Sequence, residues 1–564
     1  MQKNPDYINY QIDTLDKEAY FIQITISFRT VSENPILAIP TWRPGRYMLQ
    51  NYSANIRDWK AADQDGNSLP VEKKSRNEWI VTAKEGTLVQ FSYLYFCRQM
   101  DAGGCWNDPS LFYINPIACL MMVADQGENR CKIAFKLPET FRIATGMSYN
   151  VAEDLYEVPD FSALSDSPVL ASPNQCTLSY SIQNIPFYIH SNADVSCFPE
   201  TIVSDFSTFT QAQIDDFGSF PEKDYHFLLL LLPYTHYHGV EHRNSTVICL
   251  GPVSDVKEKL YTELLGICSH ELLHSWNICK IRPVEMLPYT LSKENYFKTG
   301  FVAEGFTTYL GDHYLAKSDV LSSDWYENEW NTLLKRHFYS FGNHHLSIAE
   351  SSFDLWVDGY DAGIPNRKVS IYVKGAIIAF LMDIAIRKSS ANKENILSIL
   401  KDLWLFYSNT GKGYSESDIE ELFHFYTKNE YKLAYSNWIY GTGDLKEALL
   451  DAFLYLDYSV TEESHSNFIA AHFGILCDSH YTVQSVDPAS PYRNNIGKGD
   501  KILSINSLPV TEFTVSEITS QVSLTIELSN GSRKWEAVLI ASDERYFKAL
   551  QIKIPKNGEN LLLR

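Results

Sequence analysis

The segment that most constrains this 564-residue chain is Cys268-Ser269-His270-Glu271-Leu272-Leu273-His274-Ser275-Trp276-Asn277, which contains the pattern His-Glu-x-x-His. Side chains four residues apart lie on one face of an α-helix, so both histidines can bind one tetrahedral Zn²⁺ while Glu271 reaches a water on the metal. The surrounding leucines and tryptophan predict a buried or cleft-facing helix, where an unpaired imidazole is costly. The alternative is a pair of surface histidines beside a solvated glutamate.

A catalytic zinc site usually has three protein ligands and one open position, so a third ligand should follow on another element. Glu304 is the candidate, because it is a lone carboxylate among apolar and small residues in Gly300-Phe301-Val302-Ala303-Glu304-Gly305-Phe306-Thr307-Thr308-Tyr309. This composition is typical of a second helix. The alternative is a solvated helix position or a structural ion pair.

Together these motifs resemble those of the glycyl aminopeptidase family, which are PDZ-containing zinc metallopeptidases (gluzincins) with a thermolysin-like catalytic domain. Other family-like segments follow in order along the chain: Ile39–Tyr47, Gly239–Thr246, Trp276-Asn277, Ile281-Arg282-Pro283 and Tyr372-Val373-Lys374-Gly375. The resemblance implies one Zn²⁺ per chain, held by His270, His274 and Glu304. It also implies an aminopeptidase that removes small first residues, glycine and alanine, from peptides with a free N-terminus.

Two catalytic roles come from the same resemblance. Glu271 is expected to act as the general base, taking a proton from the water and later passing it to the departing amine. Tyr372 precedes Val373-Lys374-Gly375, and in related gluzincin aminopeptidases a tyrosine at this place donates its hydroxyl to the oxyanion of the tetrahedral intermediate. The alternative for Tyr372 is an ordinary core tyrosine.

Glu241 and His242 are the predicted substrate-binding residues. They lie in Gly239-Val240-Glu241-His242, after the apolar run from Phe227 to Leu232, and resemble the Gly-x-Met-Glu-Asn exopeptidase signature. A carboxylate there can anchor the free α-amino group, which fixes cleavage after the first residue. Because Val240 and His242 depart from that signature, His242 can instead be a structural neighbour that orients the strand.

The expected fold class is multidomain α+β. Alternation in Tyr20–Phe28 and the turn Asp65-Gly66-Asn67 predict an N-terminal antiparallel β domain over residues 1–170. Residues 171–465 are expected to form the thermolysin-like zinc peptidase domain. It should be helical from about residue 319, as the periodicity of residues 376–386 and 395–407 indicates.

A PDZ domain is expected over residues 466–550, followed by a tail of residues 551–564. Its signature includes Phe473-Gly474-Ile475 and the segment Gly497-Lys498-Gly499-Asp500. Such a domain can hold a peptide at a sheet edge, with the peptide carboxylate bound by backbone N–H groups, here those of Phe473, Gly474 and Ile475. The alternative is a module that packs beside the cleft and restricts entry.

Composition limits the partners. The net charge of -21 argues against nucleic acid. The ten cysteines show no CxxC spacing, so neither a zinc ribbon nor a disulfide framework is indicated. No apolar stretch reaches the roughly 18 residues of a membrane helix, and Met1–Tyr7 does not resemble a secretory signal. A cytoplasmic enzyme is expected, with a periplasmic or secreted protein as the alternative if a signal was removed.

Three functions compete at this point. The first is the zinc aminopeptidase. The second is a catalytically silent scaffold that binds peptides through the PDZ domain. The third is a zinc endopeptidase, which differs from the first in accepting a peptide whose amine is acetylated. The preferred first residue depends on a pocket that only folding assembles.

Overall fold

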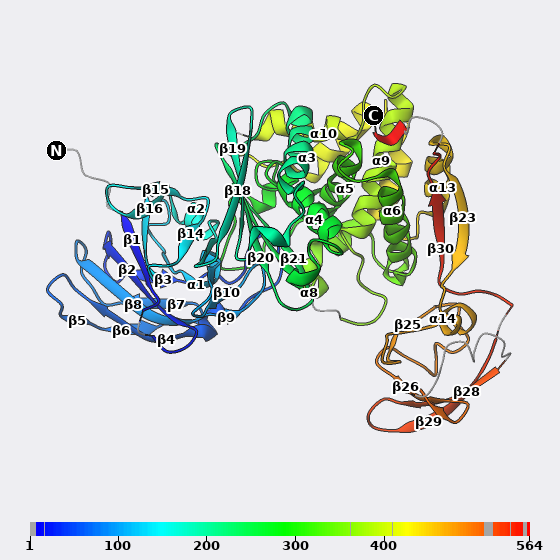
Figure 1. Ribbon diagram of the computed structural model, residues 1–564, viewed down its shortest axis with the longest axis horizontal. Coiled ribbons are helices and arrows are strands. Elements are labelled where there is room, and N and C mark those ends of the chain that lie inside the picture. Colours follow the sequence, from blue (N-terminus) through cyan, green and yellow to red (C-terminus); the bar gives the residue numbers. More distant parts are fainter. Residues whose placement is uncertain are drawn as a thin grey trace. The chain divides into compact units, whose positions relative to one another are not determined.

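The structure of the protein is a computed structural model that describes residues 7–15, 17–360, 363–408, 410–511, 523–541, 543–556 and 561–563 (Figure 1). The chain divides into two compact units. The first contains Met1–Phe297, Leu310–Val320 and Leu397–Ser415, and the second contains Lys298–Tyr309, Leu321–Ile396 and Glu416–Arg564.

The first unit begins with the β-rich domain that the sequence predicts. Strand β2 (Phe21–Arg29) buries alternate residues and pairs antiparallel with β1 (Ile8–Asp13) and β8 (Leu88–Phe96). The domain is not purely antiparallel, because β1 also pairs in parallel with β13 (Cys131–Lys136). One shared apolar core holds the layers together.

Three sheets make up this domain. The largest has the order β15 (Ser148–Asn150), β16 (Leu155–Val158), β13, β1, β2, β8, β4 (Ile56–Ala62) and β5 (Ser68–Leu69). The second has the order β14 (Arg142–Ala144), β17 (Val169–Ser172), β11 (Phe112–Ile114), β10 (Cys105–Asn107) and β9 (Arg98–Gln99). The third has the order β12 (Met122–Val123), β3 (Ile36–Ala38), β7 (Glu78–Val81) and β6 (Val71–Lys73). Two short helices, α1 (Pro116–Cys119) and α2 (Phe161–Ser165), lie between strands.

A fourth sheet contains strand β21 (His236–His242), which contributes Gly239 and Glu241 to the site described below. Its order is β18 (Cys176–Ile182), β19 (Ile185–Ser191), β20 (Tyr225–Leu231), β22 (Ser245–Gly251) and β21, so β21 is an edge strand. The apolar run from Phe227 to Leu232 lies almost wholly within β20, which is buried. Helices α3 (Ile202–Phe217) and α4 (Tyr261–Leu273) pack on this sheet (Figure 1).

The second unit is helical around α9 (Val373–Ser390), which is buried along nearly its whole length. The helices predicted at residues 376–386 and 395–407 are α9 and α10 (Ile396–Tyr407), and α10 belongs to the first unit from Leu397 onwards. Neighbouring helices are α6 (Ser323–Phe338), α7 (Ile348–Phe353), α8 (Leu355–Asp358), α11 (Glu416–Tyr426), α12 (Lys432–Tyr440) and α13 (Lys446–Tyr455). In the described parts of the chain, no helix combines the length and apolar character needed to cross a membrane.

A buried ion pair fixes α9. Asp383 accepts hydrogen bonds from Arg387 Nε at 3.1 Å, from the Tyr309 hydroxyl at 2.7 Å and from the Ile396 N–H at 2.9 Å. The remaining Arg387 donors reach the carbonyls of Leu561 and Leu562 at 3.2 and 3.3 Å. Both charges are therefore satisfied inside the fold.

A small β-rich module lies between two paired strands, β23 (Ser459–Ser464) and β30 (Lys548–Lys553), so the last residues of the expected module and the first of the expected tail form one strand. Its elements are α14 (Phe468–Phe473), β24 (Ile475–Cys477), β25 (Val483–Val486), β26 (Lys501–Ile505), β27 (Leu508–Pro509), β28 (Ser523–Ser529) and β29 (Lys534–Ile540). The Gly474 N–H donates to the Ala470 carbonyl, and Gly474 adopts a φ of 70° to end α14. This N–H is therefore already used as a helix cap.

Candidate metal centre and active site

Helix α4 is held firmly near its C-terminal end, where the metal-binding pattern lies. The Ser269 hydroxyl donates to the Gly311 carbonyl at 2.8 Å, and Trp276 stacks on Phe217 with ring centroids 4.7 Å apart. Trp276 also donates through Nε1 to the Ser219 carbonyl at 3.0 Å. Gly311 packs closely on this helix, since a Cβ atom there would lie 3.1 Å from the Cα of His270.

The two histidines present converging nitrogens. Their Nε2 atoms lie 3.1 Å apart, close to the separation of about 3.3–3.4 Å expected for two nitrogens bound to one tetrahedral zinc. The Nδ1–H of His274 can donate to the Asn277 carbonyl at 3.2 Å, which places the ring proton on Nδ1 and the lone pair on Nε2. This carbonyl role of Asn277 could not be read from the sequence.

Glu304 completes the group. One ligand atom each of His270, His274 and Glu304 lies within 4.8 Å of the others, and this is the group of three potential ligands found among the described residues. His274 is 2% and Glu304 is 3% exposed. Two imidazoles and one carboxylate are a donor set that suits zinc, so the residues present fit the metal.

Glu304 lies on a π-helical turn rather than on the regular helix expected for residues 300–309. The turn spans Phe301–Phe306 and continues into α5 (Thr307–Lys317). The Thr307 hydroxyl donates to the Ala303 carbonyl at 2.7 Å inside this widened segment. Turns of this kind occur frequently at functional sites.

The cysteines near α4 are not placed as ligands. Burial raises the pKa of both the Cys268 and the Cys279 thiols, which disfavours the thiolate form that binds metals. All ten cysteines are free, in agreement with the expectation from their spacing.

On one side of strand β21 lie two glutamates, Glu271 from α4 and Glu241 from the strand itself. A Cβ atom on Gly239 would lie 2.3 Å from Glu271 Oε1, so a larger residue at this position would displace that carboxylate. Glu241 is two residues further along and faces the same way. A Cβ atom on Gly45 would lie 2.4 Å from Glu241 Oε2, so the N-terminal motif also contacts this side chain. Glu271 and Glu241 are both buried.

His242 follows Glu241 at the end of β21 and has a hydrogen-bond partner in the N-terminal domain. Its Nδ1 lies 2.8 Å from Asp166 Oδ1, and the other oxygen of Asp166 accepts the Arg243 N–H at 3.0 Å. Asn244 donates to the Gly146 carbonyl at 2.9 Å and to Asp224 at 3.0 Å. These contacts hold the end of the strand, and they engage His242 through Nδ1.

Tyr372 lies just before α9, one turn from a close contact between two backbones. A Cβ atom on Gly305 would lie 2.4 Å from the Cα of Gly375, so the segment that carries Glu304 and the start of α9 meet through facing glycines. The glycine of the Tyr-x-Lys-Gly motif is therefore a packing requirement. Sequence reasoning identified the motif but missed this reason.

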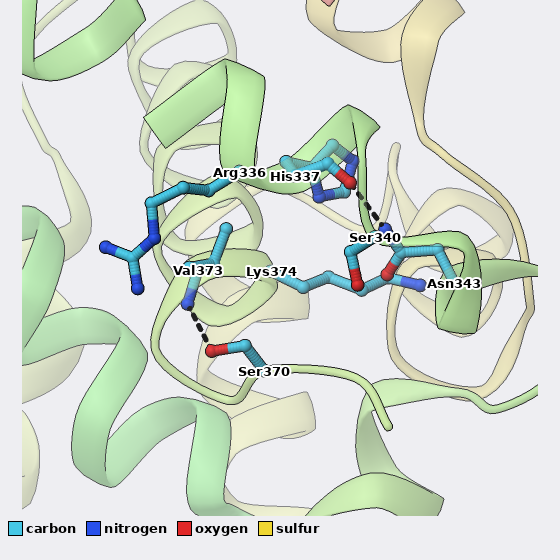
Figure 2. Close-up of a pocket in the computed structure, with 7 residues that line it drawn as sticks. All are labelled: Arg336, His337, Ser340, Asn343, Ser370, Val373 and Lys374. Atoms are coloured by element: carbon cyan, nitrogen blue, oxygen red, sulfur yellow. Dashed lines mark hydrogen bonds between the residues drawn. The ribbon is translucent and has the colours of Figure 1, made fainter. Parts of the chain in front are cut away.

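Lys374 of the same motif is also structural. It borders a cavity of about 230 Å³ with Arg336, Ser340 and Ser370 (Figure 2). Lys374 is 1% exposed, and its Nζ donates to the Gly443 carbonyl at 3.2 Å. Burial lowers the pKa of Lys374 to about 8. The Ser370 hydroxyl accepts the Val373 N–H at 3.2 Å, so both contacts fix the backbone around Tyr372.

Comparison with known proteins agrees with these features. Residues 9–173 match the Peptidase M61 N-terminal domain, and residues 263–378 match the M61 glycyl aminopeptidase model. The resemblance predicted from the motifs is thus confirmed. Comparison with curated protein sequences gives no match.

One solved structure has the same fold over nearly the whole chain. An aminopeptidase N family protein from Idiomarina loihiensis superposes with a TM-score of 0.89 at 22% identity, covering 99% of each chain. A mutant M1 zinc metallopeptidase from Deinococcus radiodurans, bound to a Tyr-Ser-Ala substrate, gives a TM-score of 0.47 at 14% identity and covers 78% of this chain and 94% of that one. The M1 zinc metallopeptidase from the same organism gives 0.45 at 13% identity, covering 77% and 93%.

Proposed function

Because the chain is a metallopeptidase of the M61 glycyl aminopeptidase family, we propose that it is a zinc-dependent aminopeptidase that removes the first residue of peptides with a free N-terminus. Glycine and alanine are the first residues that the family implies. The observation that carries the proposal is the convergence of His270, His274 and Glu304 on one point, with Glu271 on the same helix as the histidines.

The chemistry assigns one role to each group. Zinc held by the two histidines and Glu304 would supply Lewis acidity and lower the pKa of a water. Glu271 takes the proton from that water and returns it to the leaving amine. Tyr372 donates its hydroxyl to the developing oxyanion.

Glu241 supplies the exopeptidase character. Its carboxylate is buried and faces the same side of β21 as Gly239, which touches Glu271. A buried carboxylate at this position pairs with the ammonium group of a peptide, so the bond that reaches the reacting groups is the first one.

Residues 466–550 are proposed to form a PDZ domain. Since the Gly474 N–H already caps α14, a peptide carboxylate would have to use other donors than this one. This finding argues against binding of a peptide carboxylate by the Gly474 N–H. The alternative proposal is a module that restricts entry to the cleft.

The test is hydrolysis of glycyl and alanyl p-nitroanilides by the zinc-loaded protein and by Glu271→Gln. The matched control is Glu263→Gln, because Glu263 lies on the exposed side of the same helix. We expect turnover in the wild type and the control only. Cleavage of an acetylated peptide would point to an endopeptidase, and zinc binding without any turnover would point to the scaffold.

A further inference from the structure

A cavity of about 320 Å³ lies beside Glu241 in the first unit. An engineered protein cavity of roughly 150 Å³ is enough to bind benzene, so this one can hold an amino-acid side chain. Its wall is built from β21, from the N-terminal β domain, and from the loop of residues 282–291 that follows the metal-binding helix.

The N-terminal motif Trp42-Arg43-Pro44-Gly45 forms the edge of this cavity, and the proposed function leaves it without a role. Trp42 donates through Nε1 to the Thr290 carbonyl at 2.8 Å, which clamps the motif to the loop. Arg43 and Pro44 line the cavity, and Gly45 lies against the Glu241 carboxylate. The motif therefore joins the cavity to the residue proposed to bind the substrate amine.

Two buried polar side chains in the wall have unused hydrogen-bonding atoms. Asn115 is 0% exposed, and neither its Oδ1 nor its Nδ2 has a partner in the structure. His242 is 5% exposed, and its Nε2 has no partner because Asp166 engages only Nδ1. Since about 90% or more of buried polar groups are hydrogen-bonded, these atoms can pair with a ligand that offers both a donor and an acceptor.

The charged residues that line the cavity are Arg43, Arg282, Glu128, Asp166 and Glu241. Arg43 donates to the Pro44 carbonyl at 3.1 Å and lies 3.4 Å from His238 Nε2. Arg282 uses its guanidinium on the carbonyls of Ile278 and Cys279 and lies over the Tyr289 ring at 4.1 Å. Because both guanidinium groups are engaged, the cavity favours a neutral ligand. A cationic side chain would compete with the substrate amine for Glu241, and an anionic one would face the carboxylates of Glu241 and Asp166. The rest of the wall is largely apolar, with Ile117, Met122, Phe161, Leu287 and Leu291.

We propose that this cavity receives the side chain of the first substrate residue and selects a long, neutral side chain that ends in an amide, with glutamine as the best fit. Asn115 would pair with the amide as donor and acceptor, and His242 would contribute through Nε2. The inference rests on the proposed aminopeptidase function and extends it. Glycine and alanine remain substrates but leave the cavity empty.

The first test compares kcat/KM for glutaminyl, alanyl, glycyl, glutamyl and lysyl p-nitroanilides on the full-length, zinc-loaded protein. One extra methylene in a fitting pocket changes specificity by about 10-fold or more, so glutamine should exceed alanine by at least that factor. Turnover of alanine and glycine with glutamine no better than alanine would overturn the inference and leave the aminopeptidase intact. Absence of all turnover would overturn both.

The second test changes the cavity wall. Asn115→Leu keeps a similar volume and removes two unpaired polar atoms, so folding should be kept. The glutamine-to-alanine ratio should fall about tenfold in this variant. Ile117→Trp, which fills the cavity, should lower the same ratio. A ratio unchanged in both variants would contradict the assignment.

A third measurement does not depend on turnover. In the Glu271→Gln protein, L-glutaminamide should raise the thermal midpoint more than glycinamide does, because a ligand that binds only the folded state stabilises it. Asn115→Leu in that background should remove the difference. Equal shifts for the two amides would refute the pocket.

Discussion

Replacement of Gly305 by alanine is the sharpest test of how the fold positions Tyr372. The added Cβ atom would lie 2.4 Å from both the Cα and the carbonyl carbon of Gly375, whereas ordinary contacts of this kind begin at 3.4 Å. Neither of these backbone atoms can rotate away, so the two segments must separate by about 1 Å, a displacement that can lower catalysis about 10²-fold. Overpacking of this size should also lower the free energy of unfolding by about 1–3 kcal/mol.

The assay is kcat for alanyl p-nitroanilide, with zinc content and thermal unfolding measured on the same preparation. The matched control is Gly266→Ala on α4, where the nearest atom to the added Cβ is 4.0 Å away. That change should keep activity and stabilise the protein by about 0.5–1 kcal/mol, because glycine is unfavourable within a helix. Wild-type kcat and stability in Gly305→Ala would refute the argument that facing glycines set the position of Tyr372.

Three further predictions concern single side chains. Tyr372→Phe should lower kcat about 10²-fold to 10³-fold with little change in KM, and a loss below threefold in steady-state kinetics would exclude the oxyanion role. Asp383→Asn leaves Arg387 buried without a charged partner and should destabilise the fold by about 3–5 kcal/mol in denaturant unfolding. By contrast, Asp451→Asn, in an exposed pair with Lys388, should change it by about 0.5 kcal/mol or less, and equal effects would contradict this reasoning. Burial lowers the pKa of His337 to about 4. The neutral side chain therefore contributes fully to the free energy of unfolding above pH 6.5, and this contribution is lost as pH falls towards 4, with a loss of about 2 kcal/mol at pH 5. His337→Gln should show a smaller loss of stability between pH 7 and 5 than the wild type.

Much of the architecture follows from periodicity. Alternation in residues 20–28 is sufficient to predict β2, and the apolar spacing of residues 376–386 and 395–407 predicts α9 and α10. These elements can be predicted because each buries one face or all of its surface, which leaves a local pattern of apolar residues. The parallel pairing of β1 with β13 joins residues more than 100 positions apart, and no local pattern encodes it.

The candidate site also has some features that the sequence predicts and others that it does not. The spacing of His270 and His274 places both rings on one helical face whatever surrounds them. The contacts that position the other groups are long-range: Gly45 meets Glu241, and Asp166 meets His242. The π-helical turn at Glu304 was also not predictable, because the composition of its residues is equally typical of a regular helix. The sequence was sufficient to propose the candidate side chains, but it could not predict the close backbone approaches around them.

The Asp383–Arg387 pair has a consequence for synthesis. Arg387 is held partly by the carbonyls of Leu561 and Leu562, which are 174 and 175 positions later in the chain. Chains emerge from the ribosome from the N-terminal end, so α9 is exposed long before these acceptors exist. During that interval a guanidinium destined for the interior has donors without partners. We therefore expect nascent chains that stop short of this segment to keep an open, protease-sensitive helical core, even though every proposed zinc ligand has already been made.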